Sequence, residues 1–271
     1  MNDLLYHYID PAFNHLEVNS YKLLLWVGDK KFSLAVMHHN KLMVWRKPAP
    51  LAELTQAGEV QEVLNFKYHE VITGISSSYF TLVAQSVFNE SQVKDIARYL
   101  DVAPTDTVYA QPLDAFNQVI FKAPETLIQA IKSFDVTQAV FGPSGWIQAV
   151  EANQPSADEL YLNVNDDRIE IAHFDKGRLN LFNTFEFTHQ DELAYYAVFV
   201  CQQLKLDLRT LTVKLSGDIA AGDERYQHLL QDIFGAVSLN TLAVATLPEH
   251  LPQHQLLALT ALSLCASLAD V

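Results

Sequence analysis

Two stretches of the chain share one length and one pattern: YKLLLWVGDKKFSLAVMHHNKLMVWRKP at Tyr21–Pro48, the first copy, and DELYLNVNDDRIEIAHFDKGRLNLFNTF at Asp158–Phe185, the second copy. They align without a gap, so that Asp158 corresponds to Tyr21 at an offset of 137 residues. Both read as an apolar strand, a polar turn, an alternating strand, a two-residue turn and a third strand. The matched pairs are Leu23 with Leu160, Val27 with Val164, Asp29 with Asp166, Ala35 with Ala172 and Leu42 with Leu179.

The second turn of each copy supports this interpretation. It is centred on His39-Asn40 in the first copy and on Lys176-Gly177 in the second. Asn and Gly tolerate the positive φ angles of a type I′ hairpin turn. We therefore predict a three-stranded meander that occurs twice.

The residues after the second copy predict alternating helices and strands. Apolar residues at helical spacing indicate helices over 190–204, 223–234 and 252–268, and short apolar runs indicate strands over 211–217 and 236–240. The order from the second copy onward is thus βββαβαβα. The polar segment EANQPSADE just before it is the best linker candidate in the chain. We predict domains at 1–157 and 158–271.

The first domain shows a less regular version of this order. Strand-like runs follow its meander at EVITGI (70–75), YFTLVAQSVF (79–88), TVYAQPL (107–113) and NQVIFKA (117–123), and a helix is predicted over 124–134.

Composition and charge exclude several kinds of partner. The 271 residues carry a formal charge of −14, with 11 basic and 15 acidic residues over 1–150 but 7 and 17 over 151–271. Nucleic acid and anionic membrane surfaces are bound by clustered Lys and Arg, so neither is expected. No apolar run reaches the roughly 18 residues of a membrane span, so we expect no membrane insertion and a cytoplasmic location. Cys201 and Cys265 lie among apolar residues, which predicts buried thiols.

Two meander-led domains that each continue α-β-α-β-α resemble the actin, sugar-kinase and Hsp70 ATPase superfamily. Within it the layout is most similar to the PilM-type pilus proteins, and YFTLVAQSVF with the paired strands that follow resembles the DUF3822 family of Bacteroidetes. This resemblance implies an α/β fold of two actin-like (ribonuclease H-like) domains, each a βββαβαβα mixed sheet flanked by helices and related by an internal duplication.

The resemblance also implies where a nucleotide would bind, and the loops there depart from the family pattern. In the superfamily, an Asp-x-Gly-Thr type turn after the first strand of each meander holds the phosphates. The aligned residues here are Trp26-Val27-Gly28-Asp29 and Asn163-Val164-Asn165-Asp166, so both carboxylate positions have been replaced. The adenosine-binding glycine pair is reduced to one glycine in Leu215-Ser216-Gly217-Asp218. The implied degenerate nucleotide cleft comprises Gly28, Asp29, Asn163, Asn165, Asp166, Ser216, Gly217 and Asp218.

Other chemistry finds little support in the residues. The chain has no P-loop and no G-x-G-x-x-G motif, and Gly142-Pro143-Ser144-Gly145 falls short of a nucleophile elbow. His250 and His254 are four residues apart, but Pro252 lies between them and no third ligand is near. The carboxylates Asp166, Asp167, Asp223 and Glu224 are typical of turns and helix starts. We predict no catalytic residue and no metal site.

Two hypotheses for the function remain open. The first is a non-catalytic binding or scaffold protein that needs no cofactor and acts through a protein partner. The second is a divergent enzyme that binds ATP and Mg²⁺, with Asp29, Asp166 or Asp218 as the metal ligand. The sequence favours the first, because both phosphate loops have lost their pattern, and it leaves the oligomeric state open.

Overall fold

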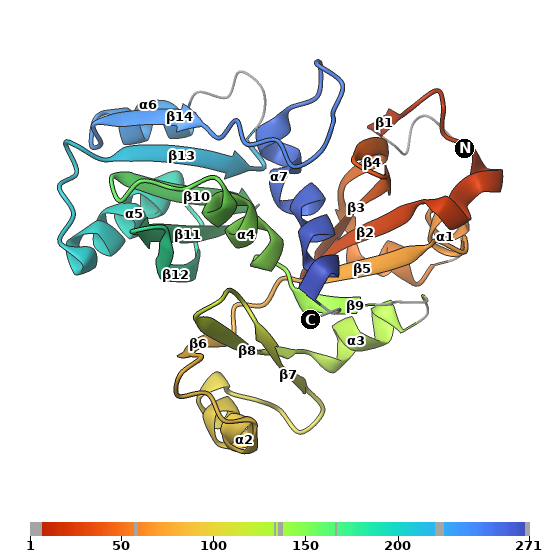
Figure 1. Ribbon diagram of the computed structural model, residues 1–271, viewed down its shortest axis with the longest axis horizontal. Helices are drawn as coiled ribbons and strands as arrows, with labels where there is room; N and C mark the ends of the chain where they lie inside the picture. Colours follow the sequence, from red (N-terminus) through yellow and green to blue (C-terminus); the bar gives the residue numbers. More distant parts are fainter. Residues whose placement is uncertain are drawn as a thin grey trace. The chain divides into compact units, whose positions relative to one another are not determined.

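The computed structural model describes residues 7–56, 59–132, 134, 138–165, 167–219 and 225–268 (Figure 1). The chain divides into two compact units: unit 1 has Met1–Gln148 and Leu259–Val271, and unit 2 has Ala149–Ala258. This division falls within helices α4 (Ser144–Ala152) and α7 (Gln253–Ala261), not in the predicted linker. It also assigns the C-terminal residues from Leu259 onward to unit 1. The domains at 1–157 and 158–271 stay a prediction.

Unit 2 is built on a five-stranded mixed sheet with the strand order β12-β11-β10-β13-β14 (Figure 1). β10, β11 and β12 form the antiparallel meander of the second copy, and β13 and β14 then add in parallel to β10. From β10 to α7 the chain order is βββαβαβα, as predicted. The bounds are β10 Glu159–Asn165, β11 Arg168–Asp175, β12 Arg178–Glu186, α5 Gln190–Leu204, β13 Thr212–Gly217, α6 Arg225–Gln231 and β14 Ala236–Leu239.

One face of this sheet packs against α5 and α6. Helix α5 begins with a capping box, in which the His189 side chain accepts from the backbone of the first turn and Glu192 accepts from the backbone of His189. Its apolar stripe meets every second residue of the three central strands, as a one-sided helix on a sheet requires. The fully buried residues of this core include Leu160, Leu162, Ile169, Ile171, Leu193, Ala197, Val200, Cys201, Val213, Leu215 and Leu230. Asp223 and Glu224 lie outside the described residues.

Unit 1 contains a six-stranded sheet with the order β1-β4-β3-β2-β5-β9, so its five strands from β4 to β9 repeat the order found in unit 2. Strand β1 (Tyr8–Ile9) extends the edge beside β4. The other elements are η1 His15–Ser20, β2 Lys22–Val27, β3 Lys31–His38, β4 Lys41–Pro50, η2 Leu51–Leu54, α1 Glu59–Leu64, β5 Glu70–Ile75, α3 Glu125–Ile131, β9 Gln138–Phe141 and η5 Leu262–Leu268.

A second, three-stranded sheet is inserted between β5 and α3 and has the order β6-β8-β7 (Figure 1). The sequence predicted these strands but not that they form a sheet of their own. The insertion makes the first half longer than the second, while the strands and helices on either side of it keep the predicted βββαβαβα order. Its elements are β6 Phe80–Ala84, η3 Glu90–Gln92, α2 Val93–Ala97, η4 Arg98–Leu100, β7 Thr107–Pro112 and β8 Asn117–Ala123.

The two meanders agree in register as well as in order. Leu23 pairs with Val36 in the first copy and Leu160 with His173 in the second, the same pairing shifted by 137 residues. The ladder to the third strand slips by one residue after Val36 and, equivalently, after His173, which makes Met43 and Asn180 the extra residues of matching bulges. A further slip in the first copy accommodates Pro48, which has no N–H to donate.

The hairpin turns are similar but not identical. Lys176 and Gly177 have φ angles of 51° and 71°, as a type I′ turn requires. In the first copy His39 has φ of 51°, whereas Asn40 is not among the residues with positive φ, so the type I′ prediction holds for the second copy only.

Two composition-based predictions can be compared with the structure. Cys201 and Cys265 are buried free thiols, and burial raises their pKa to about 11 and about 12. None of the helices in the described ranges has the length and apolar character needed to cross a membrane.

Candidate functional site

The first predicted loop is a tight turn between β2 and β3. The Gly28 N–H donates to the Lys31 carbonyl at 2.9 Å, and the Val27 carbonyl accepts from the Ser76 N–H at 2.8 Å. Asp29 is exposed at the tip. A Cβ added at Gly28 would lie 3.6 Å from the Lys31 carbonyl oxygen, an ordinary contact. Among the described residues, no contact requires a glycine at position 28.

The second predicted loop differs because its carboxylate position is buried. Asn163 is 0% exposed, and its Nδ2 donates to the Glu170 Oε2 at 2.7 Å. Asn163 and Glu170 face each other across the β10–β11 ladder, just as Trp26 faces Ser33 in the first copy. The side chain predicted to stand at the carboxylate position of the second loop is thus an amide held inside unit 2.

Glu170 is the residue that the sequence analysis missed. Its side chain is 1% exposed, and burial raises its pKa to about 7, against the hydrogen bond from Asn163 and the charge of Arg168, which both lower it. The alternating pattern of RIEIAHF predicts a solvent-facing Glu, so periodicity alone conceals it. The available signal is the register of the repeat, which sets Glu170 opposite Asn163.

Ser216, Gly217 and Asp218 meet Asn163 at the end of β13. In the parallel β10–β13 pairing Ser216 is the neighbour of Asn163, and Gly217 is the neighbour of Val164. Gly217 has φ of +91°, and a Cβ there would lie 2.1 Å from the Val164 carbonyl oxygen. The close approach of two strands therefore explains this glycine without a nucleotide. Asp218 is exposed and donates its N–H to the Val164 carbonyl at 2.7 Å.

These side chains form a polar row across the sheet of unit 2, consisting of Thr184, Glu170, Asn163 and Ser216 on β12, β11, β10 and β13. Three of its buried atoms, Thr184 Oγ1, Asn163 Oδ1 and Ser216 Oγ, have no hydrogen-bond partner within the described ranges. A buried polar atom without a hydrogen-bond partner lowers the free energy of unfolding, so this row destabilises the fold of unit 2.

The other predicted site residues lie apart from the polar row or outside the described residues. Asn165 ends β10 with its buried Nδ2 unpartnered in the described part of unit 2. Asp166 is not among the described residues. Gly28 and Asp29 lie in unit 1. Within unit 2, strand pairing sets Asn163 beside Ser216 and Val164 beside Gly217, and the Asp218 N–H donates to the Val164 carbonyl.

Metal ligation has little support from the side chains. Among the described residues, which leave out Asp166, no three His, Cys, Asp or Glu side chains are arranged to hold a metal ion. His254 lies in the first turn of α7, is buried, and places its Nε2 2.9 Å from the Ile219 carbonyl oxygen. The interpretation of the His250 and His254 pair as part of a loop and helix start is confirmed.

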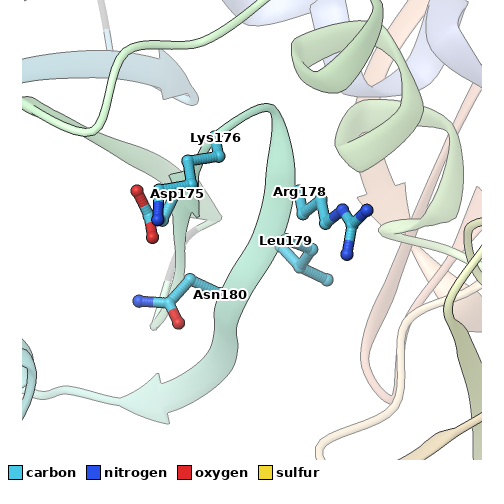
Figure 2. A pocket seen from close by; sticks show the side chains of 5 residues that line it. All are labelled: Asp175, Lys176, Arg178, Leu179 and Asn180. Carbon is cyan, nitrogen blue, oxygen red and sulfur yellow. The ribbon is translucent and has the colours of Figure 1, made fainter.

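A pocket at the β11–β12 turn contains none of the predicted site residues (Figure 2). Arg178 points away from Asp175 and Asn180, so the polar side chains that line the pocket do not converge on one point. Ligand sites combine an apolar lining with a few converging polar groups, which this turn does not provide. It is lined by Asp175, Lys176, Arg178, Leu179 and Asn180.

The fold and the loops can now be set beside known proteins. The model of the family described as "Protein of unknown function (DUF3822)" matches residues 10–232. The chain belongs to the DUF3822 family. No curated protein matches it.

Solved structures show that the fold of this DUF3822 protein is actin-like. A Bacteroides thetaiotaomicron protein with an actin-like ATPase fold and unknown function has a TM-score of 0.76 at 17% identity, covering 93% of this chain and 98% of that one. The PilM–PilN type IV pilus biogenesis complex gives 0.61 at 14% identity, with 90% and 98% covered. The ethanolamine utilization protein EutJ from Carboxydothermus hydrogenoformans gives 0.51 at 12% identity, with 97% and 95% covered. The predicted family and fold class are thus confirmed.

Proposed function

We propose that this DUF3822 protein is a non-catalytic, cytoplasmic binding or scaffold protein with an actin-like fold whose loops no longer support phosphate chemistry. The observation that carries the proposal is the hydrogen bond from Asn163 to Glu170, because it occupies the position where the superfamily presents a metal-linked carboxylate. A neutral, 0% exposed amide supplies no charge to hold Mg²⁺.

The buried carboxylate that is hydrogen-bonded to Asn163 supports the same proposal. Glu170 is fully buried and bonded to Asn163, and burial favours its protonated form. Phosphoryl transfer depends on positioned charge and a metal ion far more than on covalent chemistry. A carboxylate that is buried in the sheet, as Glu170 is, cannot hold a metal ion at the surface and so cannot help to stabilise the transition state of phosphoryl transfer.

A protein partner is proposed by analogy of fold. PilM is recorded in a complex with PilN, which makes protein binding a use that an actin-like fold of this size supports. A shared fold does not by itself imply a shared function, so the proposal of a protein partner also relies on the buried side chains of Asn163 and Glu170.

Nucleotide binding and turnover test the proposal. We expect no ATP hydrolysis above background and no shift in thermal unfolding with ATP or ADP, with or without Mg²⁺. A ligand at 100 times its Kd would stabilise the protein by about 2.7 kcal/mol, which a melting curve detects easily. A Mg²⁺-dependent stabilisation that disappears in Asp29→Asn or Asp218→Asn would instead support the divergent ATP-dependent enzyme.

A further inference from the structure

Strand β6 is an open edge of the inserted three-stranded sheet, whose order is β6-β8-β7. It lies in YFTLVAQSVF (79–88), a run of ten residues with no charge and no proline. Its five pairs with β8, from Phe80 opposite Phe121 to Ala84 opposite Asn117, show no bulge. A strand edge without bulges, charges or proline is a template for pairing with a strand of another chain.

The other sheet edges carry the protections that β6 lacks. β1 has two residues, and β9 and β14 have four each. β12 has a bulge and charged ends at Arg178 and Glu186, and β7 ends in Pro112. Short length, bulges, charges and proline are the usual ways in which proteins block edge pairing.

The backbone groups of Leu82 point away from β8. The Tyr79 carbonyl accepts from the Lys122 N–H at 3.1 Å, and the Gln85 N–H donates to the Phe116 carbonyl at 2.6 Å. Hydrogen-bonded pairs alternate along an antiparallel ladder, so Thr81 and Val83 also face β8. Leu82, with the opposite parity, presents its N–H and C=O to the open edge.

Apolar side chains extend this edge at both ends. Tyr79, Val87 and Phe116 are 49%, 68% and 43% exposed. Tyr79 directly precedes β6, Phe116 directly precedes its partner β8, and Val87 lies in the turn that follows β6. Exposed apolar groups gathered beside an open strand edge mark an interaction surface.

The charge of the segment around β6 indicates which kind of molecule pairs with this edge. From Tyr79 to Leu100 the acidic residues Glu90 and Asp95 are balanced by Lys94 and Arg98, whereas the whole chain carries −14. A charged peptide would find no complementary charge here. Two copies of this acidic protein, by contrast, repel each other least where each is neutral.

We propose that two copies of this chain associate by antiparallel pairing of their β6 strands about a two-fold axis at Leu82. Each Leu82 then donates its N–H to the Leu82 carbonyl of the other copy, and the two inserted sheets become one six-stranded sheet. Phe80 lies across from Ala84, and Thr81 across from Val83, so a large residue meets a small one and no charges are opposed.

Sedimentation velocity across about 1–100 µM, where weak dimers dissociate, tests the proposal. We expect wild type to shift toward a dimer with rising concentration. Thr81→Lys, which adds a charge to the β6 edge, should raise the dimer Kd at least about tenfold. The matched control is Ala110→Lys, because Ala110 and Thr81 flank Ile120 on opposite edges of the same sheet. The control should dimerise like wild type.

A second variant and a second measurement protect the test against misfolding. Leu82→Pro removes the outward N–H without removing a hydrogen bond to β8, and it should abolish the dimer with the circular dichroism spectrum unchanged. Amide exchange at Leu82 should slow as the wild-type concentration rises. A monomeric wild type over the whole range overturns the proposal, as does an equal effect of Thr81→Lys and Ala110→Lys.

Discussion

The two meanders share their strand order and most of their register, but they differ in the side chains at the loop end of the strands. In the first copy, the cross-strand neighbours are Ser33, Trp26 and Gly74; in the second, the equivalent positions hold Glu170, Asn163 and Ser216. A Cβ at Gly74 would lie 2.6 Å from the Leu262 side chain, so the first copy uses this position to seat an apolar group. The second copy buries three polar side chains there. The two copies thus share the bulge near the hairpin turn but differ in the chemistry of this row.

The largest contrast is expected between the loop-end glycines. Gly217→Ala should lower the free energy of unfolding by about 3–5 kcal/mol, because a side chain at φ of +91° is strained and its Cβ would meet the Val164 carbonyl oxygen at 2.1 Å. Gly28→Ala should cost less than about 1 kcal/mol, since its Cβ has room. Urea unfolding of both variants measures the difference. Equal losses would show that the two loops are equally constrained.

A smaller effect is expected from pH, and only through the second copy. The pKa of Glu170 is raised from 4.5 to about 7, so the folded protein keeps a proton that the unfolded chain releases between these values. Protonation of Glu170 therefore contributes on the order of 3 kcal/mol to the free energy of unfolding. This contribution is fully present below about pH 4.5 and is lost as the pH rises toward 7. Glu170→Gln should remove this part of the pH dependence in urea unfolding at pH 5 and pH 8.

The control for this measurement is the first copy. Ser33 corresponds to Glu170 in the repeat and has no charge to titrate. Ser33→Ala should therefore keep the wild-type slope of stability against pH. A Glu170→Gln variant with that same slope would show that Glu170 is ionised at no cost in the fold.

The smallest effect is expected at the tip of the first loop. Asp29 is an exposed turn residue, and Asn is equally suited to turns, so Asp29→Asn should change the free energy of unfolding by no more than about 0.5 kcal/mol. Thermal unfolding of the variant beside wild type measures this. A loss above about 1 kcal/mol would assign Asp29 a structural role in the first loop.

The sequence was most informative where structure is local and periodic. The offset between Leu23 and Leu160 predicted both meanders, because strand alternation and hairpin turns depend on near neighbours. The sequence also shows that Trp26 and Asn163 stand at the two positions where the resemblance to the actin superfamily leads us to expect carboxylates.

The rest depends on contacts between distant residues. An alternating strand with Glu170 looks solvent-facing, and only the covered second face of the sheet reveals burial. Likewise, β6, β7 and β8 read as ordinary strands, but whether they join the main sheet depends on pairing partners that periodicity does not specify. The assignment of Leu259 onward to unit 1 reflects packing such as that of Leu262 near Gly74, residues far apart in the chain.

The matching bulges at Met43 and Asn180 make the two hairpins candidates for exchange. An extra residue in a strand moves every following side chain to the other face of the sheet. Deleting either bulge residue would therefore expose the buried side chains in the rest of β4 or β12. Length changes among DUF3822 relatives should therefore collect at the turns and spare these two positions. A chimaera that carries Leu34–Arg46 in place of Ile171–Asn183, the part over which both hairpins pair in the same register, would preserve the inward and outward alternation on both sides of the graft.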